Sequence, residues 1–64
     1  MKITNYQAKI FQMYADGNTI PKIAVKLNKT QSSVHGVMWY VKFKYKFPTF
    51  TNVVADLIRK GIID

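Results

Sequence analysis

The chain contains no cysteine and only three acidic residues, and both shortages exclude classes of function. Without thiols it forms neither a disulfide framework nor a thiolate metal site, which fits a reducing compartment such as the cytoplasm. Asp16, Asp56 and Asp64 are spread over separate segments. With the single His35 they offer no paired carboxylates, triad or metal-ligand spacing, and a glycine-rich phosphate loop is also missing. We therefore expect no enzyme and no cofactor or metal.

Long apolar runs are also missing, so the sequence predicts neither a membrane span nor a signal peptide. In contrast, ten Lys and Arg residues give the 64-residue chain a formal net charge of +7. Such an excess implies an anionic partner, either nucleic acid or an acidic membrane surface. The lysines are distributed over several segments instead of one face of a single amphipathic helix, which favours nucleic acid.

Apolar periodicity predicts a single all-α domain with four helices. The first helix begins at Thr4, which forms a capping box with Gln7, and it ends at Asp16-Gly17. Its expected apolar stripe consists of Tyr6, Ile10, Met13 and Tyr14. The fourth helix covers residues 50–60, begins after Thr49 or Thr51, and is terminated by Gly61.

Between them, residues 20–45 have the pattern of a helix-turn-helix unit. Thr19 and Thr30 are the expected N-caps of its two helices, and Asn28 is among the few non-glycine residues that tolerate the positive φ of a tight turn. The inward stripes comprise Ile20, Ile23, Ala24 and Leu27, then Val34, Val37, Met38 and Val41. On a basic chain, this unit is the usual frame for placing the second helix in a DNA major groove.

Residues 41–47 alternate strictly between apolar residues and lysine, which is a strand signal and would indicate a wing. The helical stripe from Val34 nevertheless continues through Val41 to Tyr45, and this favours a helix to about Tyr45. In both cases Lys42, Lys44 and Lys46 form a basic cluster.

The candidate DNA contacts centre on the outward face of the second helix of the helix-turn-helix unit. Gly36 is costly inside a helix, but on a groove-facing surface it would let the backbone approach DNA. The expected base contacts are Gln31, Ser32, His35, Gly36 and Trp39. The expected phosphate contacts are Lys22, Lys26, Lys29, Ser33, Tyr40, Lys42, Lys44 and Lys46.

The apolar face of the fourth helix is wider than one side of a three-helix core requires. We expect Val54, Leu57 and Ile58 to form a homodimer contact; the alternative is that the whole face packs inward. A chain of this size buries only about 60% of the surface that its unfolded form exposes, so dimerisation would also stabilise it.

Several segments resemble LuxR-type (GerE-like) DNA-binding domains, and the resemblance covers essentially the whole chain. Its stretches are Ile3-Thr4, Ile10 through Gly17, Lys22 through Leu27, Ser33-Val34, and Asn52 through Ile63 with its Gly61-Ile62-Ile63 ending. The sequence departs from the usual family pattern at Gln7, Lys22, His35 and Val37, so an operator sequence does not carry over.

The resemblance implies a free-standing four-helix domain that binds double-stranded DNA as a dimer and regulates transcription in a bacterial or bacteriophage-host cytoplasm. It also implies base contacts at His35, Gly36 and Trp39. No receiver or ligand-sensing domain is expected, and therefore no small-molecule ligand. Two alternatives remain: a small module that docks on RNA polymerase, similar to sigma region four, and the DNA-docking piece of a recombination or packaging machine.

Overall fold

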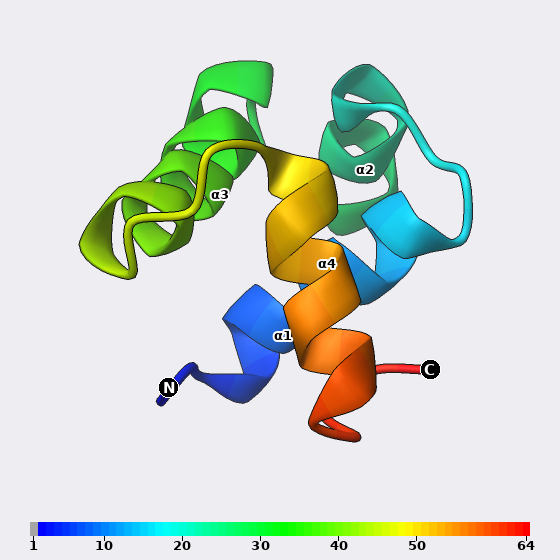
Figure 1. Cartoon of the computed structure of the whole chain (residues 1–64). Helices are drawn as coiled ribbons and strands as arrows, with labels where there is room; N and C mark the ends of the chain where they lie inside the picture. Colours follow the sequence, from blue (N-terminus) through cyan, green and yellow to red (C-terminus); the bar gives the residue numbers. More distant parts are fainter. Residues whose placement is uncertain (1) are drawn as a thin grey trace.

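The computed structural model describes residues 2–64, which form four α-helices and no strand (Figure 1). They are α1 (Asn5–Ala15), α2 (Ile20–Leu27), α3 (Gln31–Lys44) and α4 (Phe50–Arg59). The all-α prediction is confirmed. The alternation at residues 41–47 is not a strand, because α3 continues to Lys44 and Tyr45 is its C-cap.

Each helix begins after a threonine whose hydroxyl accepts a hydrogen bond from the backbone N–H three residues later. The donor–acceptor distances are 3.1 Å at Thr4, 3.4 Å at Thr19, 3.1 Å at Thr30 and 3.2 Å at Thr49. Gln7 completes the capping box, since its Oε1 accepts from the Thr4 N–H at 2.9 Å. The predicted N-caps are thus confirmed, and Thr49, not Thr51, begins α4.

The turn between α2 and α3 depends on the left-handed conformation of Asn28, whose φ is 55° and ψ 46°. The chain reverses there, and the Lys29 N–H donates to the Ala24 carbonyl at 2.9 Å. An asparagine adopts this conformation at lower cost than a branched residue. The predicted role of Asn28 is confirmed, and the turn fixes where α3 starts relative to α2.

Helix α3 ends at Lys44, before Pro48 could interrupt it. Lys46 adopts a positive φ of 59°, and the Phe47 N–H returns to the Lys42 carbonyl at 2.9 Å. The helix therefore closes before the proline, and the chain turns away towards α4 (Figure 1).

The core is entirely apolar and receives residues from every helix. Its buried members are Ile10, Phe11, Ile23, Ala24, Val34, Met38, Val41, Val53, Leu57 and Ile63. Two expectations need correction. Phe11 and not Tyr6 completes the buried stripe of α1, since Tyr6 is exposed, and Leu57 is a core residue without exposed surface.

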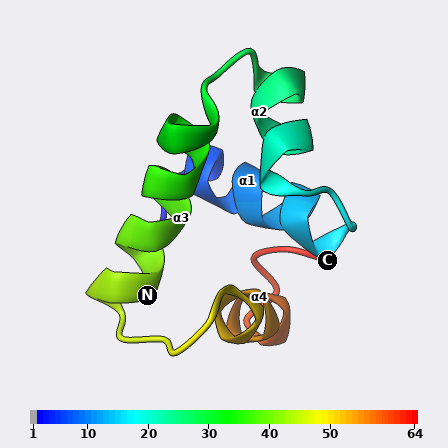
Figure 2. The same cartoon turned by 90° about the horizontal axis from the view of Figure 1, so that it is seen from above.

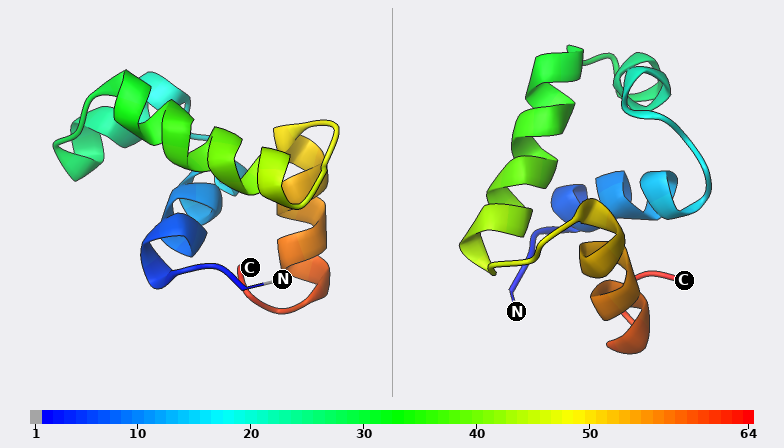
Figure 3. Two further views of the ribbon diagram at one scale, coloured as in Figure 1. Left: turned by 90° about the vertical axis from the view of Figure 1, so that its left-hand side faces the viewer. Right: turned by 45° about the horizontal axis from the view of Figure 1, so that its top comes forward.

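The arrangement leaves one long side of α3 open. In Figure 2, α2 and α3 diverge from their connecting turn above α1, and α4 lies against the opposite side of α1. Figure 3 shows α3 extending along the edge of the molecule from the α2 turn to the loop before α4. Helix α3 contacts α1, α2 and α4 through its inner face. Its outer face is therefore available to a partner.

Among residues 2–64, none of the helices has the length and apolar composition of a membrane span.

Candidate nucleic-acid interface

Three of the predicted base-contacting residues gather at the N-terminal half of α3. Gln31, Ser32 and His35 line a shallow hollow together with Ile20, which comes from the first turn of α2. The three side chains are exposed, whereas Val34 between them is fully buried. The first turns of α3 thus present an amide, a hydroxyl and an imidazole on one short surface.

His35 is positioned by an aromatic contact from another helix. Its ring meets the Phe50 ring edge-to-face, with centroids 5.9 Å apart and planes at 83°. Phe50 is the first residue of α4, half-buried, and also packs edge-to-face against Tyr14 at 6.1 Å. The sequence pattern did not identify Phe50 as part of the site, because its contact with His35 depends on how α4 returns to α3.

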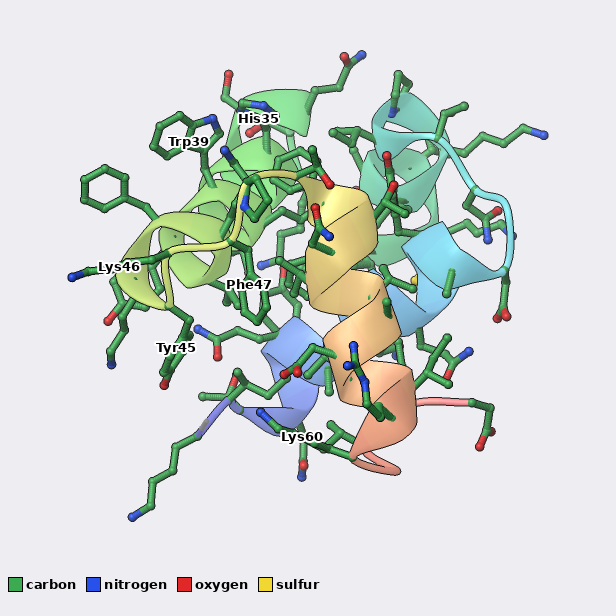
Figure 4. All side chains as sticks on the ribbon, viewed as in Figure 1. His35, Trp39, Tyr45, Lys46, Phe47 and Lys60 are labelled. Carbon is green, nitrogen blue, oxygen red and sulfur yellow. The ribbon has the colours of Figure 1, made fainter. Side chains whose placement is uncertain are left out.

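Trp39 lies one turn further along α3 and on the same outer side as His35 (Figure 4). Its indole stacks on Phe43 with centroids 5.6 Å apart and planes 24° from parallel. The Lys42 ammonium lies 4.7 Å from the centre of the Trp39 ring, within cation–π range. Trp39 is therefore part of an exposed aromatic and basic group and does not cover the core.

Gly36 lies between these groups on the open side of α3. A Cβ at this position would meet no atom within 4 Å, so packing inside the protein does not require glycine. Glycine inside a helix costs about 1 kcal/mol relative to alanine. A close approach from outside the molecule would account for glycine here.

The predicted phosphate contacts flank α3 at both ends. Lys22, Lys26 and Lys29 are exposed on α2 and the following turn, while the other three lysines lie at or just after the end of α3. Since a helix rises about 1.5 Å per residue, the 14 residues of α3 place its two ends roughly 20 Å apart. The stretch from residue 17 to residue 55 contains no acidic side chain. Both basic groups therefore lie in a segment without local neutralising charge.

Local contacts hold some of these lysines. Lys26 donates from Nζ to Asn18 Oδ1 at 3.0 Å, which directs it towards the loop before α2. Lys44 lies 5.5 Å from the ring centres of both Tyr40 and Tyr45. Hydrogen bonding to Tyr40, reinforced by the two phenol groups, raises the pKa of Lys44 above its usual value of 10.5. Lys44 therefore remains cationic throughout the physiological pH range.

The remaining candidates occupy both edges of this face. Ser33 is exposed while its backbone N–H is bonded to the Thr30 hydroxyl, so its own hydroxyl can contact a phosphate. Tyr40 is exposed beside Lys44. Lys46 extends from the turn that ends α3, far from His35 (Figure 4).

The expected dimer face of α4 is smaller than predicted and shifted. Leu57 packs within the subunit, Val54 is half-buried, and Ile58 is exposed. Ile62, which the prediction did not include, is also exposed just beyond the helix. Ile58 and Ile62 thus leave apolar surface exposed at the C-terminal end of α4, and Val54 lies half-buried one turn before Ile58.

No protein-family model, curated protein or solved structure matches this chain. In the part of the chain that the structure describes, no three His, Cys, Asp or Glu side chains come together in a group that could hold a metal ion.

Proposed function

We propose that this chain is a sequence-specific double-stranded DNA-binding protein that regulates transcription, with the N-terminal half of α3 in the major groove. The observation that carries the proposal is the shared surface of Gln31, Ser32 and His35, exposed at the start of a helix with lysines at both ends. Amide, hydroxyl and imidazole groups can bond base edges. A major groove about 12 Å wide admits one α-helix, and the two basic groups would lie near the phosphates around it.

Each proposed contact follows from its place on α2, on α3 or in the turns next to them. Gln31, Ser32 and His35 read base edges, Gly36 allows close backbone approach, and Trp39 supplies an apolar contact. The phosphate contacts are the six lysines at positions 22, 26, 29, 42, 44 and 46, together with Ser33 and Tyr40. Because DNA-binding helices of this type contact bases mainly through their N-terminal residues, the residues near Lys44 are placed towards the backbone.

We also propose a LuxR-type arrangement and a homodimer. Support for the former comes from four helices, from the left-handed Asn28 between α2 and α3, and from Gly61 with a positive φ of 72° before Ile62-Ile63. Support for the latter comes from the exposed side chains of Ile58 and Ile62, with the half-buried Val54 one turn before Ile58. In this proposal the protein acts in the cytoplasm and needs no cofactor.

A salt titration tests DNA binding directly. For mixed-sequence duplex DNA, the logarithm of the affinity should fall linearly with the logarithm of the salt concentration, with a slope of about −0.9 per phosphate contact. The double variant Lys42→Gln/Lys44→Gln should bind more weakly and have a slope shallower by about 1.8. Lys9→Gln on α1 removes an exposed charge outside the proposed interface and is the control.

Two outcomes would overturn the proposal. One is duplex affinity without a salt slope, and the other is a Lys42→Gln/Lys44→Gln variant that binds as Lys9→Gln does. Binding to RNA polymerase in the absence of DNA would instead favour the polymerase-docking alternative. Selection from a random duplex pool completes the test, since a palindromic site would establish specificity and a two-fold symmetric dimer together.

A further inference from the structure

The C-terminal half of α3 presents three large aromatic side chains to solvent within five residues. Trp39 is 43%, Tyr40 55% and Phe43 72% exposed. Inserting the first turns of α3 into a groove does not use this surface fully, because Phe43 lies 12 residues and thus about 18 Å along the helix from Gln31. Exposed aromatic residues so close together indicate a binding surface.

The aromatic rings are organised and are accompanied by positive charge. Phe43 and Trp39 form an offset stack, and Lys42 lies over the Trp39 ring. Lys44 lies near the Tyr40 ring in the same way. The side chains are therefore arranged as flat apolar faces next to ammonium groups, on a segment without a carboxylate.

Exposed aromatic rings beside ammonium groups indicate which kind of partner fits this surface. An acidic protein surface would match the positive charge, and a neutral apolar one would match the aromatic rings. A strand of unpaired nucleotides matches both, because bases and phosphates alternate along it. Every base offers a π-face, and every linkage carries a phosphate. Proteins that bind single strands use aromatic platforms beside a basic groove in this way.

We propose that the surface formed by Trp39, Tyr40, Lys42, Phe43 and Lys44 binds single-stranded nucleic acid, with an unpaired base stacked on Phe43. Phe43 is the most exposed ring of the group, so a base placed on it extends the stack that Trp39 begins. Lys42 and Lys44 contact the adjoining phosphates. The site rests on the nucleic-acid affinity of the proposed function but concerns a different form of the polymer, one with unpaired bases.

The only tryptophan of the chain is in this surface, and it reports on the site directly. The probes are a ten-nucleotide deoxythymidine strand, a ten-nucleotide uridine strand and a blunt mixed-sequence duplex. Either single strand should quench Trp39 emission on binding, and comparing the two distinguishes DNA from RNA as the source of the unpaired bases.

Phe43→Leu retains an apolar side chain but removes the ring. Since stacking contributes about 1–3 kcal/mol per base, this variant should lose about 5- to 150-fold in single-strand affinity. Its affinity for the blunt duplex should change by no more than about twofold. Tyr6→Leu replaces an exposed aromatic residue on α1 and should bind the single strands as the parent protein does.

Three results would overturn the inference. The first is no quenching of Trp39 at a saturating concentration of single strand, and the second is equal single-strand affinity of Phe43→Leu and Tyr6→Leu. The third is a Phe43→Leu variant whose only defect is lost self-association, measured by sedimentation without nucleic acid. The last result would assign the surface to a second copy of the chain. Failure of the proposed function is distinguishable. It would remove blunt-duplex binding, while single strands would still quench Trp39 and Phe43→Leu would still bind them more weakly.

Discussion

The imidazole of His35 packs edge-to-face on the phenyl ring of Phe50, so the start of α4 contacts the surface that we propose reads DNA. Edge-to-face aromatic pairs stabilise a geometry by about 0.5–1.5 kcal/mol beyond the area that they bury. The contact restricts the directions in which an otherwise exposed imidazole can point. Helix α4 therefore has a role at the candidate site as well as in the core.

We predict that His35→Ala weakens binding to a selected duplex site by about 5- to 150-fold, the value of one good base contact, and affects random duplex much less. Phe50→Leu should weaken specific binding by a smaller factor, because it releases the imidazole but leaves it present. A double-mutant cycle measured by fluorescence anisotropy tests the coupling. Additive effects of the two substitutions would show that Phe50 does not position His35.

The α2–α3 turn gives a prediction for stability. Asn28→Gly should be tolerated within about 1 kcal/mol, because glycine adopts the left-handed conformation freely. Asn28→Val should destabilise the protein by about 1–2 kcal/mol or more, since a branched side chain clashes at positive φ. Urea unfolding followed by circular dichroism measures both values. Equal stability of the two variants would mean that the turn relaxes to another conformation.

The features that the sequence predicted correctly are mainly local. A threonine before an apolar-periodic run begins a helix through a hydrogen bond to a residue nearby in the sequence. Asn28, four residues after Ala24, forms the turn through its own φ angle and the backbone hydrogen bonds around it. The register of α3 was predictable for a related reason, because Val34, Met38 and Val41 form a narrow stripe that can face only one way.

The features that it missed depend on contacts between helices. In α1, both Tyr6 and Phe11 are aromatic residues near Ile10, and only packing against the other helices decides that Phe11 is buried and Tyr6 exposed. The same applies to Leu57. The apolar face of α4 is so wide that the sequence does not indicate which of its residues are buried in the core. At the candidate site, Phe50 carries no local signal for its contact with His35. The stack of Trp39 on Phe43, by contrast, follows a four-residue helical spacing that is visible in the sequence.

The exposed Ile58 on α4 leads to a prediction about oligomeric state. Ile58→Asp should give monomers in sedimentation and reduce affinity for a palindromic site, because it places a charge on a 46% exposed apolar residue without disturbing the core. Val25→Asp is a matched control for self-association, since Val25 is an exposed apolar residue on α2. Leu57→Asp should instead unfold the subunit, because it buries a charge without a partner. If Ile58→Asp retains the parent mass and the parent protein is dimeric, the dimer forms through another surface.

The residues after α4 return to α1, and the contribution of these contacts to stability can be measured. Ile63 is almost fully buried, and the neighbouring Asp64 N–H donates to Gln12 Oε1 at 2.7 Å. Gln12 Nε2 donates to the Asp64 backbone oxygen at 3.3 Å and to Asp16 Oδ1 at 3.1 Å. Gln12→Ala should cost about 0.5–1.5 kcal/mol for each hydrogen bond lost, reduced by solvent access at this exposed position.

Ile63→Ala should cost more, about 2–5 kcal/mol, because it removes buried methyl groups beside α1. Amide hydrogen exchange should show that the two substitutions affect different parts of the chain. Gln12→Ala should increase exchange mainly at residues 62–64, whereas Ile63→Ala should increase it throughout the core through the lower free energy of global unfolding. Equal unfolding midpoints for the two variants in urea would mean that Ile63 contributes no more than the hydrogen bonds beside it.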